Sequence, residues 1–174
     1  LWFIAMENLF TDEDSYLTKG ADYQLYYEGG TGLLHPLQFD GNETFKTNDT
    51  NLSPVYGETL AIRPLISRLL AVPELRQRYL AHVRTIMNES LDWTVLEKKV
   101  TAYQALIGEE VAADTKKLST NAQYASSAAD LKNMVTARKT YLSGFAEVNR
   151  TAPAITSVAR EMTVARDIAG MAVR

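Results

Sequence analysis

Hydrophobic residues recur at helical spacing through most of the chain after residue 60. Between Ile62 and Leu70 they fall three and four positions apart, which predicts an amphipathic helix. Pro73 ends that helix and suits the first turn of the next one. The stripe expected to face the core in this next helix consists of Leu75, Tyr79, Val83 and Ile86.

Two further helices are predicted beyond residue 90. Asp92 or Thr94 is expected to cap the first, because a short polar side chain can accept a hydrogen bond from the first-turn backbone. Its predicted core stripe is Trp93, Leu96, Val100, Tyr103, Ile107 and Val111. Asp130 is predicted to cap the second helix. The periodicity fades after Asn149, so residues 149–174 are expected to be a linker or the start of another module.

The first 59 residues follow a different pattern. Trp2 to Phe10 predicts a buried helix, and the polar residues 11–15 predict a loop. Two aromatic and aliphatic runs, residues 23–27 and 33–39, are separated by a glycine-rich stretch and predict a β-hairpin. Pro36 has no N–H to donate, so its strand is expected at an edge. The chain is therefore predicted to be α+β and mainly helical, with one small hairpin.

Composition and charge exclude several classes of protein. The 174 residues are long enough for one domain with a real core, and a net charge of -3 gives no reason to expect nucleic-acid binding. The chain has no cysteine and two histidines, which excludes disulfides, thiolate metal sites and cysteine nucleophiles. No apolar run reaches the roughly 18 residues that cross a bilayer, so no membrane span is expected.

The candidate chemistry lies in carboxylates that frame the hairpin. Asp14 lies in the loop before it, Asp22 at its start and Asp40 at its end, with Asn42 close by. Because a hairpin brings its two ends together, Asp22 and Asp40 are expected to lie close in space, and the Asp14 loop leads to the same end. Carboxylates gathered in this way would repel one another without a cation, and such hard oxygen ligands suit Mg²⁺ or Mn²⁺. An ordinary solvated acidic surface is the alternative explanation of the same residues.

The order of these features matches the phosphoryl-transfer half of a protein kinase: a helix, a loop with Asp, a hairpin and a second Asp. Five stretches also resemble the spore coat protein H (CotH) kinase family, over about residues 1–148. They are residues 8–15, 20–26, 33–45, 68–80 and the helix that begins near Leu91. The family consists of atypical protein kinases that transfer phosphate from ATP to Ser or Thr of protein substrates. The resemblance therefore implies the carboxy-terminal lobe of a kinase-like fold.

The resemblance also implies roles for single residues. Asp14 matches the catalytic-loop aspartate and Asp40 the metal-binding aspartate after the hairpin. Asp22 falls where a second metal ligand is expected, Asn42 lies next to that shell, and Lys19 could reach a phosphate. The implied cofactors are ATP and Mg²⁺ or Mn²⁺, the implied partner is a protein substrate, and family habit suggests the spore coat, the cell surface or secretion.

Two departures from the family qualify these expectations. Phe39 stands where many members have Trp or His before the metal-binding Asp, and Gly41 loosens the loop that follows it. The amino-terminal lobe, with its phosphate-covering loop and ATP-holding lysine, is expected upstream of Leu1, so these 174 residues alone are expected to be inactive. The alternatives are a pseudokinase or a helical protein-binding module without turnover, and, last, a Ca²⁺-binding surface.

Overall fold

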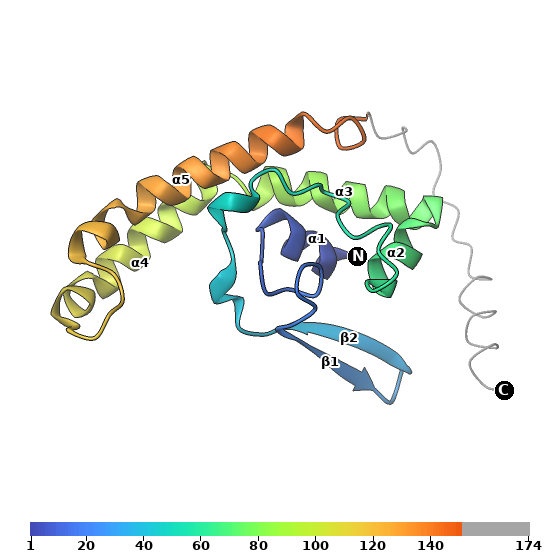
Figure 1. Ribbon diagram of the computed structural model, residues 1–174, viewed down its shortest axis with the longest axis horizontal. Helices are drawn as coiled ribbons and strands as arrows, with labels where there is room; N and C mark the ends of the chain where they lie inside the picture. The colour runs from blue at the N-terminus through green and yellow to red at the C-terminus, as the bar shows by residue number, and fades with distance from the viewer. Residues whose placement is uncertain (151–174) are drawn as a thin grey trace.

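Five α-helices and one β-hairpin make up residues 1–150, the part of the chain that the computed structural model describes (Figure 1). The mainly helical α+β prediction is confirmed. The elements in chain order are α1 (Trp2–Leu9), β1 (Tyr23–Glu28), β2 (Leu33–Gln38), the 3₁₀ helices η1 (Gly41–Glu43) and η2 (Thr47–Asp49), α2 (Pro64–Leu70), α3 (Pro73–Glu89), α4 (Trp93–Ala113) and α5 (Asn121–Ser143). Most of the predicted linker, residues 151–174, lies outside the described residues.

The predicted hairpin is confirmed, with its strands over nearly the predicted residues. β1 and β2 pair antiparallel from Tyr23 opposite Gln38 to Glu28 opposite Leu33. The backbone N–H of Gly32, which has a φ of +71°, donates to the Glu28 carbonyl at 2.8 Å and closes the turn. Both strands of a two-stranded sheet are edges, so the missing N–H of Pro36 is tolerated. The end of the hairpin opposite this turn points back toward α1 (Figure 1).

The hydrophobic core surrounds α1, which lies between α3 and the hairpin (Figure 1). Ile4, Ala5 and Leu9 of α1 are buried. The predicted stripe of α3 is confirmed at three of its four positions, because Tyr79, Val83 and Ile86 are fully buried while Leu75 is only partly covered. A short apolar helix is thus enclosed on several sides, and the loop that follows it starts from a rigid support.

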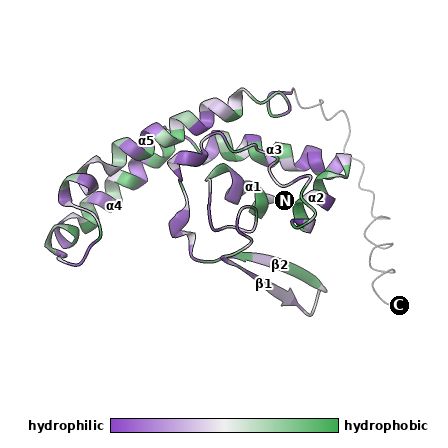
Figure 2. Ribbon diagram, viewed as in Figure 1, coloured by the Kyte–Doolittle hydropathy of each residue, from purple (hydrophilic) through white to green (hydrophobic). Residues whose placement is uncertain are grey.

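The helices α4 and α5 run side by side and project away from the core (Figure 1). No residue of α4 is buried, so its predicted core stripe is wrong over much of its length. Tyr103 is 63% exposed and Ile107 44%. Green and purple alternate along both helices in Figure 2, but among the described elements α5 is the main neighbour of α4, so much of the apolar face of α4 stays uncovered. None of the described helices is both long and apolar enough to cross a membrane.

The start of α5 corrects the prediction that Asp130 caps this helix. Thr120 is the N-cap, and it forms a capping box with Gln123: the Gln123 N–H donates to Thr120 Oγ1 at 3.2 Å, and the Thr120 N–H donates to Gln123 Oε1 at 2.8 Å. Asp130 lies inside the helix, where its carboxylate accepts from Ser126 Oγ at 3.3 Å. The first turns of α5 are rich in Ala and Ser, so they show no apolar stripe that would predict a helix.

The start of α4 confirms one of the two alternatives for its cap. Asp92 is the N-cap, and its carboxylate accepts from the Thr94 N–H at 2.8 Å. Lys139 of α5 forms an ion pair with the same carboxylate. The Lys139 ammonium and the Thr94 donors lower the pKa of Asp92 to about 2. One side chain therefore both starts α4 and connects it to α5.

A buried arginine connects α5 to the end of α1. Arg138 is completely buried, and its guanidinium donates to the carbonyl oxygens of Asn8 at 3.1 Å and Leu9 at 3.3 Å. It also donates to Asn8 Oδ1 at 2.9 Å and to the carbonyls of Thr50 at 3.2 Å and Leu52 at 2.5 Å. Burial lowers the pKa of Arg138 to about 10, so the group stays charged at neutral pH. Its donors satisfy carbonyls at the negative end of the α1 dipole.

Removing this guanidinium is expected to destabilise the fold strongly. Arg138→Met leaves several buried carbonyl oxygens without donors, so the free energy of unfolding should fall by about 3 kcal/mol or more. Lys132→Met, on the exposed side of α5, is the matched control and should change it by less than about 0.5 kcal/mol. Urea unfolding followed by circular dichroism measures both. Equal midpoints for the two variants would contradict the assigned role of Arg138.

The position of the α5 cap gives a second stability test. Thr120→Ala removes the capping oxygen and should lower the free energy of unfolding by about 1 kcal/mol. Asp130→Ala should leave it nearly unchanged, because Asp130 is exposed within the helix. Thermal unfolding of the two variants makes the comparison. If Asp130→Ala were the more destabilising substitution, α5 would begin near residue 130 instead.

Candidate functional site

The open end of the hairpin brings two of the predicted site residues close together along the backbone. The N–H of Phe39 donates to the carbonyl oxygen of Asp22 at 3.3 Å. Asp40 follows directly, at the N-cap of η1, where its side chain makes no capping hydrogen bond. Asp22 and Asp40 therefore flank the end of the ladder from its two strands, as the hairpin prediction requires.

The loops at this end of the hairpin hold an unusual backbone conformation. Thr11, Asp22, Asp40 and Phe45 have φ values of +48°, +48°, +47° and +61°, and within the described residues they are the only non-glycine residues with positive φ. Such conformations cost about 1–3 kcal/mol each and persist where surrounding contacts impose them, commonly at functional sites. Their concentration in the loops around the hairpin supports this region as the candidate site.

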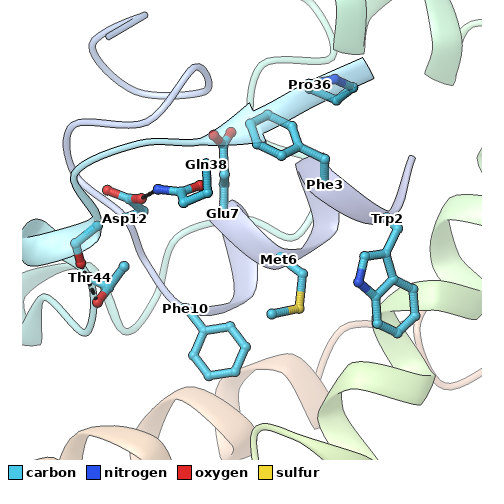
Figure 3. Close-up of a pocket in the computed structure, with 10 residues that line it drawn as sticks. Trp2, Phe3, Met6, Glu7, Phe10, Asp12, Pro36, Gln38 and Thr44 are labelled. Carbon is cyan, nitrogen blue, oxygen red and sulfur yellow. Dashed lines mark hydrogen bonds between the residues drawn. The ribbon is translucent and has the colours of Figure 1, made fainter. Parts of the chain in front are cut away.

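Asp12 occupies the centre of the loop that precedes the hairpin. It is only 2% exposed. One carboxylate oxygen, Oδ1, accepts from the Asp14 backbone N–H at 3.3 Å, and the other, Oδ2, accepts from Gln38 Nε2 at 2.9 Å (Figure 3). Burial raises the pKa of Asp12, and the charges of Asp14 and Asp22 act in the same direction, against the two hydrogen bonds. The sequence did not single out Asp12, because adjacent acids in a polar loop look alike.

The predicted base and the predicted phosphate ligand contact each other. Lys19 Nζ forms an ion pair with Asp14 and lies 3.5 Å from Glu13 Oε1. The side chain of Lys19 is 54% exposed and that of Asp14 26%. Hydrogen bonding to Asp14 raises the pKa of Lys19. The ammonium of Lys19 thus lies beside the carboxylate of Asp14 at the surface of the loop.

The loop after Asp40 carries its own pairs of charges. Asn42 Nδ2 donates to Glu43 Oε1 at 3.2 Å, and both Asp40 and Asn42 are exposed. Lys46 forms ion pairs with Glu43 and, at 3.4 Å, with Glu13. The negative charge of the two loops is therefore partly balanced by lysines, and Lys46 connects one loop to the other.

The donor set fits only a metal that takes few protein ligands. Within residues 1–150 there is no group of three His, Cys, Asp or Glu side chains that could hold a metal ion, so a three-carboxylate centre is not preformed. Mg²⁺ is commonly bound by one or two carboxylates, with water and substrate phosphates completing its shell. Asp22 and Asp40, with the Asn42 amide oxygen nearby, match that smaller requirement.

A cavity of about 390 Å³ lies beside these loops, between α1 and β2 (Figure 3). Its walls are mostly apolar: Trp2, Phe3, Met6, Phe10 and Pro36, with Glu7, Asp12 and Gln38 as polar members. Glu7 points from α1 toward β2, is 3% exposed, and among the described residues neither of its carboxyl oxygens has a hydrogen-bond partner. Burial raises the pKa of Glu7 to about 8, and the nearby Asp12 adds to this effect.

Sequence reasoning missed Glu7 as well as Asp12. The sequence did contain one indication of its position. Glu7 lies four residues after Phe3 and three before Phe10, so it shares a helix face with two aromatic residues. This spacing does not show whether the carboxyl group of Glu7 is buried or exposed to solvent. Only the placement of β2 over α1 decides that it is covered.

Comparison with known proteins gives one finding. The model of a family described as CotH kinase protein matches residues 1–142. No curated protein and no solved structure matches the chain. The match ends near the carboxyl end of α5, so it includes the hairpin, both acidic loops and Arg138.

The buried carboxyl of Glu7 predicts a specific pH dependence of stability. Its pKa is raised from 4.5 to about 8 in the folded chain, so the folded state holds one more proton than the unfolded state between these values. The free energy of unfolding should therefore fall as pH rises from about 4.5 to 8. One pKa unit corresponds to about 1.4 kcal/mol, so the total loss is on the order of a few kcal/mol.

Glu7→Gln should remove this contribution. The variant should be more stable than the parent chain at pH 9 and should show a flatter dependence between pH 5 and 8. Glu89→Gln on the exposed end of α3 is the matched control and should follow the parent curve. Melting temperatures measured across this pH range test the assignment, which fails if the curve of Glu7→Gln runs parallel to that of Glu89→Gln.

Proposed function

Because this chain belongs to the CotH kinase protein family, we propose that it transfers the γ-phosphoryl group of ATP to a Ser or Thr side chain of a protein substrate. The match to this family over residues 1–142 is the observation that carries the proposal. In this proposal residues 1–148 are the carboxy-terminal lobe of a kinase-like domain. The left-handed conformations of Asp22 and Asp40 support the hairpin end as its active site.

Asp14 is the proposed catalytic base. It accepts the proton of the substrate hydroxyl while that oxygen bonds to the γ-phosphorus and the bond to the β–γ bridging oxygen breaks, which releases ADP. This chemistry depends on alignment and on electrostatic stabilisation more than on covalent steps by the protein. The side chain of Asp14 is 26% exposed, which keeps it within reach of a substrate hydroxyl.

Asp40 and Asp22 are the proposed ligands of Mg²⁺ or Mn²⁺, with Asn42 next to them. When bound, the metal would neutralise the negative charge of the ATP phosphates. Lys19 is proposed to contact a phosphate, which requires its ammonium to turn away from Asp14. The four left-handed residues and the backbone hydrogen bond between Phe39 and Asp22 support a fixed placement of these ligands.

The alternative is a pseudokinase or helical protein-binding module without turnover. The observation that favours it is the ion pair between Lys19 and Asp14, which engages the carboxylate of the proposed base. The exposed Tyr103 and Leu106 of α4 would suit a protein-binding surface. The two functions differ in whether the hairpin acids are needed for phosphate transfer.

Substitution of the two central acids tests the kinase proposal in the full-length protein. Asp14→Asn and Asp40→Asn should each lower phosphate transfer by about 100-fold or more, because one removes the base and the other a charged metal ligand. The measurement is transfer of radiolabelled γ-phosphate from ATP to the protein itself and to a peptide library containing Ser and Thr, with Mg²⁺ or Mn²⁺ present. Asp130→Asn on α5, far from the hairpin in sequence and exposed, is the control.

Unchanged transfer in both Asp14→Asn and Asp40→Asn would overturn the proposal. A separate measurement distinguishes the alternative, since ATP with Mg²⁺ should raise the melting temperature of a pseudokinase without any transfer. A protein-binding module should show neither effect. Circular dichroism of each variant checks that the loss of transfer does not arise from unfolding.

A further inference from the structure

The backbone of Asp12 is fixed to the end of α1. Its N–H donates to the Glu7 carbonyl at 3.0 Å, and the Thr11 N–H donates to the Asn8 carbonyl at 3.2 Å, which together end the helix in a Schellman motif. Its own carbonyl accepts from Thr18 Oγ1 at 3.1 Å, across the same loop. Thr11, immediately before it, has a φ of +48° and turns the chain out of the helix. The carboxylate of Asp12 therefore projects from a support that α1 holds in place.

The two oxygens of this carboxylate bind two different segments. Oδ1 accepts from the backbone N–H of Asp14 at 3.3 Å, two residues from its own position. Oδ2 accepts from Nε2 of Gln38 at 2.9 Å, 26 residues away at the end of β2 (Figure 3). A carboxylate that is only 2% exposed is costly unless its oxygens are hydrogen-bonded. These two hydrogen bonds therefore offset the energetic cost of burying the carboxylate.

A second contact holds the far side of the loop that contains Asp40. The Glu13 N–H donates to the Glu43 carbonyl at 3.1 Å. The segment from residue 39 to residue 42 thus lies between two anchors, Gln38 on Asp12 and Glu43 on Glu13. Both anchors belong to the loop that also contains Asp14. The spacing between the proposed base and the proposed metal ligand depends on these bonds.

We propose that Asp12 is a positioning residue, which bridges the Asp14 backbone and the Gln38 side chain and so sets the distance between the base and the metal-ligand loop. This inference rests on the proposed phosphoryl transfer. Asp12 is only 2% exposed and both of its carboxylate oxygens are already hydrogen-bonded, so it acts through its two neighbours. Such a residue affects the rate through the alignment of the reacting groups, since a misplacement of about 1 Å can lower a rate by about 100-fold.

The first test removes the hydrogen bond between Gln38 and Asp12 and leaves Asp12 itself unchanged. Gln38→Leu should lower kcat for phosphate transfer about tenfold or more, with the KM for ATP changed less than about twofold. Gln24→Leu is the matched control, because Gln24 is an exposed glutamine on the partner strand and its kcat should stay at the parent value. A parent-like kcat for Gln38→Leu would overturn the proposal.

A reversed pair then separates positioning from general destabilisation. Gln38→Glu sets a carboxylate against Asp12, so kcat should fall. In the double variant Asp12→Asn/Gln38→Glu the amide of residue 12 can donate to the new carboxylate and still accept from the Asp14 N–H. That double variant should recover most of the lost kcat. If it is as slow as Gln38→Glu with the same melting temperature, the bridge is not what sets the rate.

A third readout does not depend on turnover. Hydrogen exchange of the Asp14 backbone N–H, followed by NMR, should be faster in Gln38→Leu than in Gln24→Leu, because Asp12 loses the partner that holds its carboxylate in place. If the parent protein transfers no phosphate, the proposed function fails, and the exchange rate still decides whether Asp12 holds the two segments together. Equal exchange in the two variants would overturn the bridge itself.

Discussion

The structure depends on a buried guanidinium that has carbonyl oxygens and one amide oxygen, rather than carboxylates, as its partners. Arg138 brings α5 against the last residues of α1 and against the segment around Thr50 and Leu52. A buried cation of this kind is stabilised only while all of its acceptors stay in place, so the three segments form as a unit. The end of α1 becomes a fixed point, and the loop that carries the acidic residues leaves from there within three residues.

Single hydrogen bonds connect this fixed end of α1 to the acidic loop and to the hairpin. The Asp12 N–H caps the end of α1, and the Asp12 carboxylate binds both the Asp14 backbone and Gln38 at the end of β2. The hairpin has little core of its own, since Leu25 and Leu34 are more than half exposed. Its position is therefore set at the open end, where it meets α1 and the acidic loop. That is the end where the proposed metal ligands lie.

The region around the hairpin holds features that a purely structural loop would avoid. Glu7 and Asp12 are buried carboxyl groups, burial raises the pKa of both, and the loops contain residues in the left-handed region. Each feature lowers stability by itself. The proposed phosphoryl transfer would give a reason for their presence, because that chemistry requires charged groups held at fixed separation. The core around α1 and α3 and the Arg138 contacts supply the stability that this arrangement requires.

The sequence by itself determined the elements whose signals are local. The hairpin, the short helix α1 and three of the four positions of the α3 stripe follow from side-chain periodicity and turn residues, and the cap of α4 was narrowed to Asp92 or Thr94. The Asp130 cap and the α4 stripe were wrong because an Ala- and Ser-rich helix shows no stripe and because periodicity does not reveal whether a neighbour covers the face. Only the tertiary structure decided that Arg138, Glu7 and Asp12 are buried. Their burial comes from segments distant in the chain, and the energy of a charged or acidic group depends on the polar partners that those segments bring.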